Sequence, residues 1–242
     1  MSHGCSVVHG CATAAAGARI AAVSRLGDTC PPVALARTEI PYRSQYASPE
    51  LASEIAAGRV TLEQDPRWRE AGARDPQEYV RWARCGCGMA CLQMILEARG
   101  GPVPPLVELG RRAIAYGGYE ARPPRGFGPL IYAGFVDFAA AEFGLAARVA
   151  APLPLDELLR VVAADEVVLA SVSAEIRSLA AEPARRGGHL VLVIDCSADG
   201  RRLCFHDPAG DRSDNAPAVW LERDSFARFY AERGIAVTLP RA

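Results

Sequence analysis

The hydrophobic pattern of the chain changes from a helical period to a strand-like one near residue 165, and this change limits the folds open to it. Before that point, capping residues and apolar positions three and four apart predict helices. After it, short runs rich in Val, Leu and Ile alternate with turn residues, which is typical of strands. The predicted strands are 166–174, 187–196, 201–210 and 234–239. We therefore expect an α+β fold, with a helical N-terminal part packed on a C-terminal antiparallel sheet, because a parallel sheet would alternate helices and strands.

Caps and turn residues divide the helical part into separate elements. The predicted helices are 48–58, 65–73, 75–83, 87–101, 106–116, 130–143 and 155–164. The helix 87–101 has the strongest pattern, with one apolar stripe made of Ala90, Cys91, Met94, Ile95 and Ala98. A short alternating run at 38–46 precedes the helices, and a Pro/Gly-rich loop occupies 117–129. The segment 1–36 has no sustained period and is expected to be a flexible or weakly structured arm, so the folded domain is 37–242.

Composition excludes several classes of function. The chain has 242 residues, 50% hydrophobic and 23% charged, which is ordinary for a globular protein. A net charge of -1 offers no general attraction to nucleic acid. All 27 basic residues are arginine, so neither Schiff-base chemistry nor a phosphate-loop lysine is available. No stretch reaches the ~20 consecutive apolar residues of a membrane helix, so we expect no membrane partner.

Eight cysteines are too few, in a chain of this length, for a disulfide scaffold. The N-terminus lacks the basic and continuous apolar regions of a signal peptide, so a cytoplasmic location is expected. There the cysteines would be thiols, and any function they have would be catalytic or metal-binding.

Three residues in separate segments form a candidate catalytic set. Cys87 begins the helix 87–101, where unpaired N–H groups and the helix dipole favour a thiolate. Gly86 and Gly88 on either side leave room for a substrate to approach the backbone. His189 follows two glycines at the start of an otherwise apolar strand, as one of only four histidines in the chain. A cysteine on a helix that faces a histidine on a strand is the arrangement of papain-type catalysis.

Asp207 ends the following strand, where Asp-Pro turns the chain. The Asp199-Gly200 turn predicts that the strands 187–196 and 201–210 pair as an antiparallel hairpin. In such a hairpin the end of the second strand lies beside the start of the first. Asp207 would then accept a hydrogen bond from one ring nitrogen of His189 and fix its tautomer.

Four segments in order, IPYRSQY, CGMACLQMIL, GGHLVLVID and HDPAG, resemble signatures of the bacteriocin-leader (double-glycine) cysteine peptidases and their stand-alone bacterial relatives. The resemblance runs from about Ile40 to Gly210 and implies a papain-like fold. We expect no cofactor and no metal. The resemblance implies that Cys87 is the nucleophile, His189 the general base and Asp207 the orienting residue. It further implies that the amide of Gln45 lines the oxyanion hole. The sequence departs from the family in the long segment between Gln45 and Cys87, and it has no transporter segment.

Two alternative chemistries remain open at this stage. Zinc would gather Cys85, Cys87 and Cys91 with His189 or His206, although their spacing is not a usual zinc knuckle. A second metal-like group stands in the arm, at His3, Cys5, His9 and Cys11. His206 and Cys91 themselves are expected to be structural, and Cys85 to be a small residue without a redox role.

The other alternative keeps the same catalytic set. An acyl-enzyme on Cys87 can be released by an amine as well as by water, which would make the protein an acyltransferase, peptide cyclase or ligase of peptide natural-product biosynthesis. A catalytically silent papain-like binding protein is disfavoured by the intact set. The expected partner is a peptide or peptidyl substrate, and the sequence does not indicate an oligomeric state.

Specificity is expected from long segments around this set. The loop 117–129 and the segment between Ser48 and Trp82 are the candidates, because loops on a rigid scaffold often carry binding. Trp68, Tyr79 and Trp82 either line that surface or belong to the core.

Overall fold

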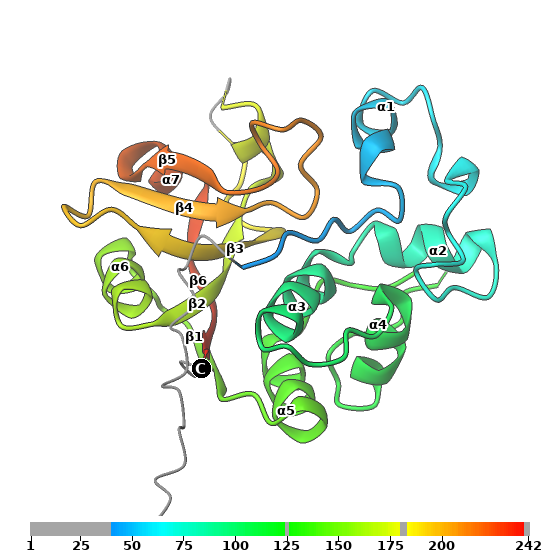
Figure 1. Cartoon of the computed structure of the whole chain (residues 1–242), viewed down its shortest axis with the longest axis horizontal. Coiled ribbons are helices and arrows are strands. Elements are labelled where there is room, and N and C mark those ends of the chain that lie inside the picture. Colours follow the sequence, from blue (N-terminus) through cyan, green and yellow to red (C-terminus); the bar gives the residue numbers. More distant parts are fainter. Residues whose placement is uncertain (1–39, 124–125, 180–182, 240–242) are drawn as a thin grey trace, which may run out of the picture. The chain divides into compact units, whose positions relative to one another are not determined.

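Helices precede a sheet in the computed structural model, as the change of period predicts (Figure 1). The structure describes residues 40–123, 126–179 and 183–239, all within the compact unit Pro32–Ala242. The predicted arm 1–36 and its boundary lie outside these residues. Within them, no helix is both long and apolar enough to cross a membrane.

The helices of the described part lie mainly before the sheet. They are α1 (Ala52–Ala56), α2 (Pro76–Ala83), α3 (Cys87–Ala98), α4 (Leu106–Ile114), α5 (Tyr132–Phe143), α6 (Leu155–Ala163) and α7 (Arg223–Phe229). Short 3-10 turns occupy η2 (Pro49–Leu51), η3 (Leu62–Gln64) and η4 (Ala174–Arg177). The strands are β1 (Ala147–Ala150), β2 (Glu166–Val172), β3 (His189–Cys196), β4 (Arg202–His206), β5 (Val219–Glu222) and β6 (Tyr230–Thr238).

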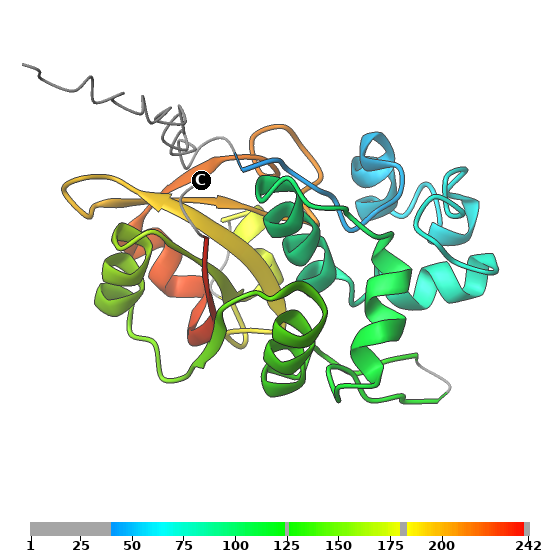
Figure 2. The same ribbon diagram turned by 60° about the horizontal axis from the view of Figure 1, so that its bottom comes forward.

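The six strands form one antiparallel sheet in the order β1-β6-β2-β3-β4-β5. Helices cover both of its faces, with α3 and α5 on one side and α6 and α7 on the other (Figure 2). Successive residues of β3 therefore enter different cores: Leu192 packs with α3, whereas Val191 and Val193 pack with α6. Burial on both faces explains why the sequence of β3 reads as a continuous apolar run. The predicted α+β architecture is confirmed.

The helix α3 is buried all round, since every residue from Gly88 to Leu96 is buried. The sequence had predicted a single apolar stripe, but the buried surface of α3 extends around the whole helix. The helix packs on β3 on one side and on α4 on another, so both its sides carry apolar or small residues. This burial fixes the position of its first residue, Cys87, against the sheet.

The predicted helix at 65–73 is wrong, because the chain there forms successive turns. The carboxylate of Asp65 is used in tertiary contacts rather than as a helix cap. It accepts hydrogen bonds from the hydroxyls of Ser48 and Tyr79 and from the backbone N–H of Arg67. The matching prediction at Asp75 is confirmed, since its carboxylate caps α2 by accepting from the N–H of Glu78.

Other local expectations need correction. The run 38–46 forms no strand over its described residues 40–46, although Pro41 had suggested a strand edge. The helix predicted at 48–58 is short, being divided between η2 and α1. The strands β1 and β5 and the helix α7 were not predicted, because each is short and lacks a strong periodic signal.

Close packing between α2 and α4 gives a test of the helical part. A Cβ at Gly110 would lie 2.4 Å from the ring of Trp82, whereas one at Gly101 would meet only Leu96 O at 3.6 Å. Alanine is favoured over glycine in a helix by about 1 kcal/mol, but overpacking a core costs about 1–3 kcal/mol. We expect Gly110→Ala to lower the free energy of unfolding in urea and Gly101→Ala to leave it nearly unchanged. Equal stability of the two variants would contradict this packing.

Candidate active site

Cys87 is the first residue of α3, and Gly86 is its N-cap. A helix leaves the N–H groups of its first turn, here including that of Cys87, without intrahelical acceptors. The helix dipole adds a partial positive charge at this end. The side chain is half-buried and lines a cleft.

The glycines that flank Cys87 have a packing role. A Cβ at Gly86 would come within 2.8 Å of the Trp82 carbonyl, and a Cβ at Gly88 within 2.6 Å of the Leu130 side chain. The space that the sequence suggested for a substrate is thus filled, at these two positions, by the protein itself. The glycines let α3 begin against its neighbours, which places Cys87 at the edge of the cleft.

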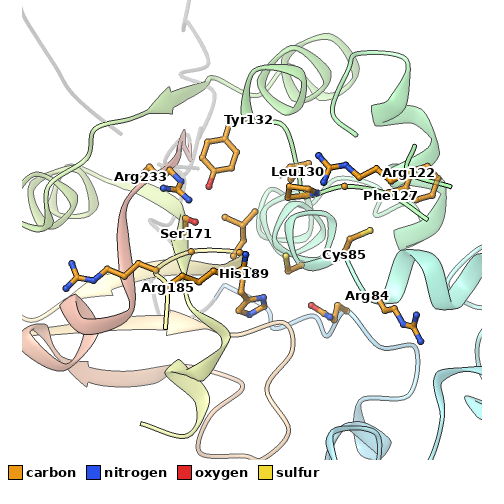
Figure 3. A pocket seen from close by; sticks show the side chains of 18 residues that line it. Arg84, Cys85, Arg122, Phe127, Leu130, Tyr132, Ser171, Arg185, His189 and Arg233 are labelled. Carbon is orange, nitrogen blue, oxygen red and sulfur yellow. The ribbon is translucent and has the colours of Figure 1, made fainter. Parts of the chain in front are cut away.

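His189 begins β3 and is 7% exposed. Gly187 and Gly188 before it have φ of 92° and 99°, which a residue with a side chain rarely adopts. This glycine pair turns the chain into the strand just where the imidazole faces the cleft. Figure 3 shows His189 in the cleft, with Cys85 of the helical side nearby.

The hairpin of β3 and β4 brings Asp207 to His189, as predicted. The register pairs Leu192 with His206, so the end of β4 lies beside the start of β3. The His189 Nε2 is 2.7 Å from the Asp207 Oδ1. The same oxygen accepts a hydrogen bond of 2.8 Å from the N–H of Ala209. Asp207 is 1% exposed, and its Oδ2 lies 4.0 Å from the guanidinium Nε of Arg177.

The pKa of His189 reflects this environment. Burial lowers the pKa, but the negative charge of Asp207, its hydrogen bond, and the contact with Cys87 all raise it. The raising causes win, and the pKa of His189 rises to about 10. Because Asp207 holds Nε2, the remaining ring nitrogen, Nδ1, is the one available to Cys87.

Gln45 reaches the same cleft from the segment before η2. Its Nε2 donates a hydrogen bond of 2.8 Å to the carbonyl of Ala83, just before the turn that leads to Cys87. The backbone N–H of Gln45 donates to the carbonyl of Pro208, beside Asp207, at 2.8 Å. The long segment between Gln45 and Cys87 therefore does not separate them in space, although nothing local in the sequence indicated this.

The cleft has a volume of about 770 Å³ and contains Cys87, His189 and Gln45 in its lining. The loop 117–129 contributes to it, as expected, through Arg122, Phe127, Gly128 and Pro129. Tyr79 and Trp82, in contrast, are fully buried core residues and do not line it. Five arginines also line the cleft. They were not predicted, because no local pattern distinguishes them from the other arginines of the chain.

The arrangement of the other chemical groups bears on the zinc alternative. Among the described residues, no three His, Cys, Asp or Glu side chains gather in a way that could hold a metal ion. Cys91 is fully buried in the core, as expected. His206 is also buried, donating from Nε2 to the Ile40 carbonyl and accepting at Nδ1 from the Ala218 N–H. The His/Cys group of the arm lies outside the described residues.

Cys85 and Cys87 make a matched pair for a test of reactivity, since both line the cleft. Burial, followed by the nearby Cys87, raises the pKa of Cys85 to about 12, so it stays a thiol at neutral pH. Only a thiolate reacts rapidly with iodoacetamide. We expect mass spectrometry of the alkylated native protein to find Cys87 modified at neutral pH and Cys85 unmodified. Preferential modification of Cys85, or equally slow reaction of both, would contradict activation of Cys87 by His189.

Comparisons with known proteins find similarity among solved structures. No family model matches the sequence, and a search of curated proteins finds no match. Among solved structures, a Bacillus anthracis protein described as a C39-like peptidase is similar, with 17% sequence identity and a TM-score of 0.45. The match covers 65% of this chain and 90% of that chain. The function proposed below rests on the residues of the cleft and not on this similarity.

Proposed function

We propose that the protein is a papain-like cysteine peptidase that cleaves a peptide, or a peptidyl thioester, through an acyl-enzyme on Cys87. One observation carries the proposal: a buried imidazole, His189, has its Nε2 2.7 Å from a buried carboxylate and also interacts with Cys87, a cysteine at a helix start. A nucleophile, a base and an orienting group within reach of one another define this kind of catalysis.

The first half of the reaction forms the acyl-enzyme. His189 Nδ1 takes the proton of the Cys87 thiol, and Asp207 stabilises the resulting imidazolium through Nε2. The thiolate then attacks the carbonyl carbon of the substrate and forms a C–S bond. As the tetrahedral intermediate collapses, the C–N bond breaks and His189 gives its proton to the leaving amine. In the second half, His189 takes a proton from water, whose oxygen displaces the Cys87 sulfur.

Two donors would stabilise the tetrahedral oxyanion in this proposal. One is the N–H of Cys87, which has no intrahelical acceptor. The other is the side-chain amide of Gln45, which uses one N–H for the Ala83 carbonyl and has a second one to offer. Its Oε1 is buried without a hydrogen-bond partner among the described residues. The opposite orientation of the amide would place Oε1 against the Ala83 carbonyl oxygen, and two acceptors repel each other. The amide nitrogen of Gln45 is therefore the atom that contacts this carbonyl.

An amine acceptor would use the same acyl-enzyme and lead to peptide cyclisation or ligation. One experiment tests the acyl-enzyme and also separates the two endings. The protein is mixed with a peptidyl p-nitrophenyl ester and quenched in acid, and intact mass spectrometry follows the adduct. We expect an acyl group on Cys87, its absence in Cys87→Ala, and its presence in the matched variant Cys85→Ala. Release of the acyl group from Cys87 by water alone indicates a peptidase, whereas faster release when glycinamide is added indicates a transferase.

If Cys87→Ala still turns over the ester or still carries the adduct, the proposed nucleophile is wrong. Labelling of Cys85 in place of Cys87 would have the same meaning.

The pKa of His189 gives a pH-dependent test. A group whose pKa is raised on folding keeps its proton until the pH passes that value, so the thiolate–imidazolium pair is lost on the alkaline side. Asp207→Asn removes the charge that raises this pKa. We expect the variant to lower kcat/KM about 100-fold or more, and to move the alkaline limb of the pH profile to lower pH. An unchanged alkaline limb in a folded variant would show that Asp207 does not set the protonation of His189.

A further inference from the structure

Among the residues that the structure describes, positively charged side chains line the cleft around Cys87 and His189, and no acidic side chain does. Five arginines from separate segments line it, namely Arg84, Arg122, Arg185, Arg186 and Arg233. The whole chain has a net charge of -1, so this concentration of one sign is a local property of the cleft.

The arginines stand on both sides of the catalytic pair (Figure 3). Arg84 and Arg122, the helix-side arginines, come from the turn before α3 and from the loop 117–129. Arg185, Arg186 and Arg233, the sheet-side arginines, come from the segment before β3 and from β6.

Several of these guanidinium groups lie close to glycines that line the cleft. A Cβ at Gly187 would lie 2.7 Å from Nη2 of Arg233, and a Cβ at Gly188 would lie 3.6 Å from Nη2 of Arg185. The guanidinium groups of Arg233 and Arg185 thus lie beside the glycine pair that leads into His189. On the helical side of the cleft, a Cβ at Gly128 would lie 2.8 Å from Nε of Arg122.

Four of the five cleft arginines lack an acidic partner among the described residues. Arginines elsewhere form ion pairs such as Arg111–Glu78 at 2.9 Å and Arg223–Asp156 at 2.7 Å. In the cleft, only Arg122 has a described acidic neighbour, Glu120 at 3.9 Å, and both side chains are exposed. The other four form no ion pair with any described acidic residue, and their charges remain available to a ligand.

We infer that the cleft binds a peptide segment that carries acidic side chains on both sides of the bond presented to Cys87. A carboxylate matches the planar fork of guanidinium, and a groove lined by one sign of charge concentrates the opposite sign. An extended peptide lying across the catalytic pair places side chains on both sides of the cleft. The same charges repel basic peptides, which adds specificity. This inference rests on the proposed function for the identity of the ligand as a peptide.

The test uses binding, so that it does not depend on turnover. The full-length Cys87→Ala chain is titrated against fluorescent peptides of one length that differ only in carrying Glu, Gln or Lys at the same positions. One exposed charge pair is worth up to about fivefold in affinity. With several arginines engaged, we expect the Glu peptide to bind about tenfold tighter than the Gln peptide or more, and the Lys peptide weakest. Added salt should reduce the preference.

Variants assign the preference to the cleft. Arg185→Gln combined with Arg233→Gln should reduce the Glu-over-Gln ratio several-fold, and Arg122→Gln should reduce it separately. Arg160→Gln is the matched control, because Arg160 is exposed on α6 and does not line the cleft. Arg233→Glu should shift the preference toward the Lys peptide, and circular dichroism checks that each variant is folded.

Each outcome counts for or against the inference. Equal affinity for the three peptides, or loss of the Glu preference in Arg160→Gln alone, would overturn it. Tighter binding of a single-stranded oligonucleotide than of the Glu peptide would also overturn it, by indicating a polyanion site. Failure of Cys87 to form an acyl adduct would refute the proposed function, but it would not affect the charge preference found in the peptide titrations. The two can therefore fail independently.

Discussion

The contact between His189 and Asp207 is the interaction on which the rest of the site depends. A carboxylate that is 1% exposed needs hydrogen bonds and an opposite charge, since an unpaired buried charge costs several kcal/mol. Asp207 obtains them from His189 Nε2, the Ala209 N–H and the more distant guanidinium of Arg177. The imidazole, held in this way, presents one defined nitrogen to the cleft. A one-residue slip of β4 against β3 would turn the side chains of β4 to the opposite faces and break the contact.

The turn that carries Asp207 also positions residues from the N-terminal part of the chain. The Pro208 carbonyl accepts from the N–H of Gln45, and the Asp207 carbonyl accepts from the hydroxyl of Tyr42. The preceding residue, His206, donates a hydrogen bond from its Nε2–H to the Ile40 carbonyl. The segment from residue 40 to Gln45 thus follows the end of β4 without forming a strand. This explains how Gln45, a polar residue with no local signal, reaches the cleft.

The sequence predicted the elements and residues whose signals are local. The cap of α2, the hairpin turn and the glycines around Cys87 and His189 each act over a few residues, and the structure contains the elements they predict. The helix expected at Asp65 failed because its carboxylate serves Ser48 and Tyr79, a tertiary use that resembles a cap in sequence. Gln45 was named through family resemblance alone, since its proximity to Cys87 depends on contacts across the whole domain.

The charge of the cleft could not be predicted from the sequence either, because it too depends on contacts between distant segments. A chain with 27 arginines and a net charge of -1 reads as balanced, and only the fold separates arginines that pair from those that do not. Guanidinium groups in an open cleft stay hydrated, so their lack of partners costs the free protein little. Their mutual repulsion, however, is relieved when a ligand brings carboxylates. An acidic substrate would therefore gain from the sheet-side and helix-side arginines together while its carbonyl lies at Cys87. Cleavage divides these contacts between two fragments: the acyl part on Cys87 keeps those on its own side, and the first product keeps those on the other. Because the first product is then held by fewer arginines than the intact peptide was, it would dissociate more readily.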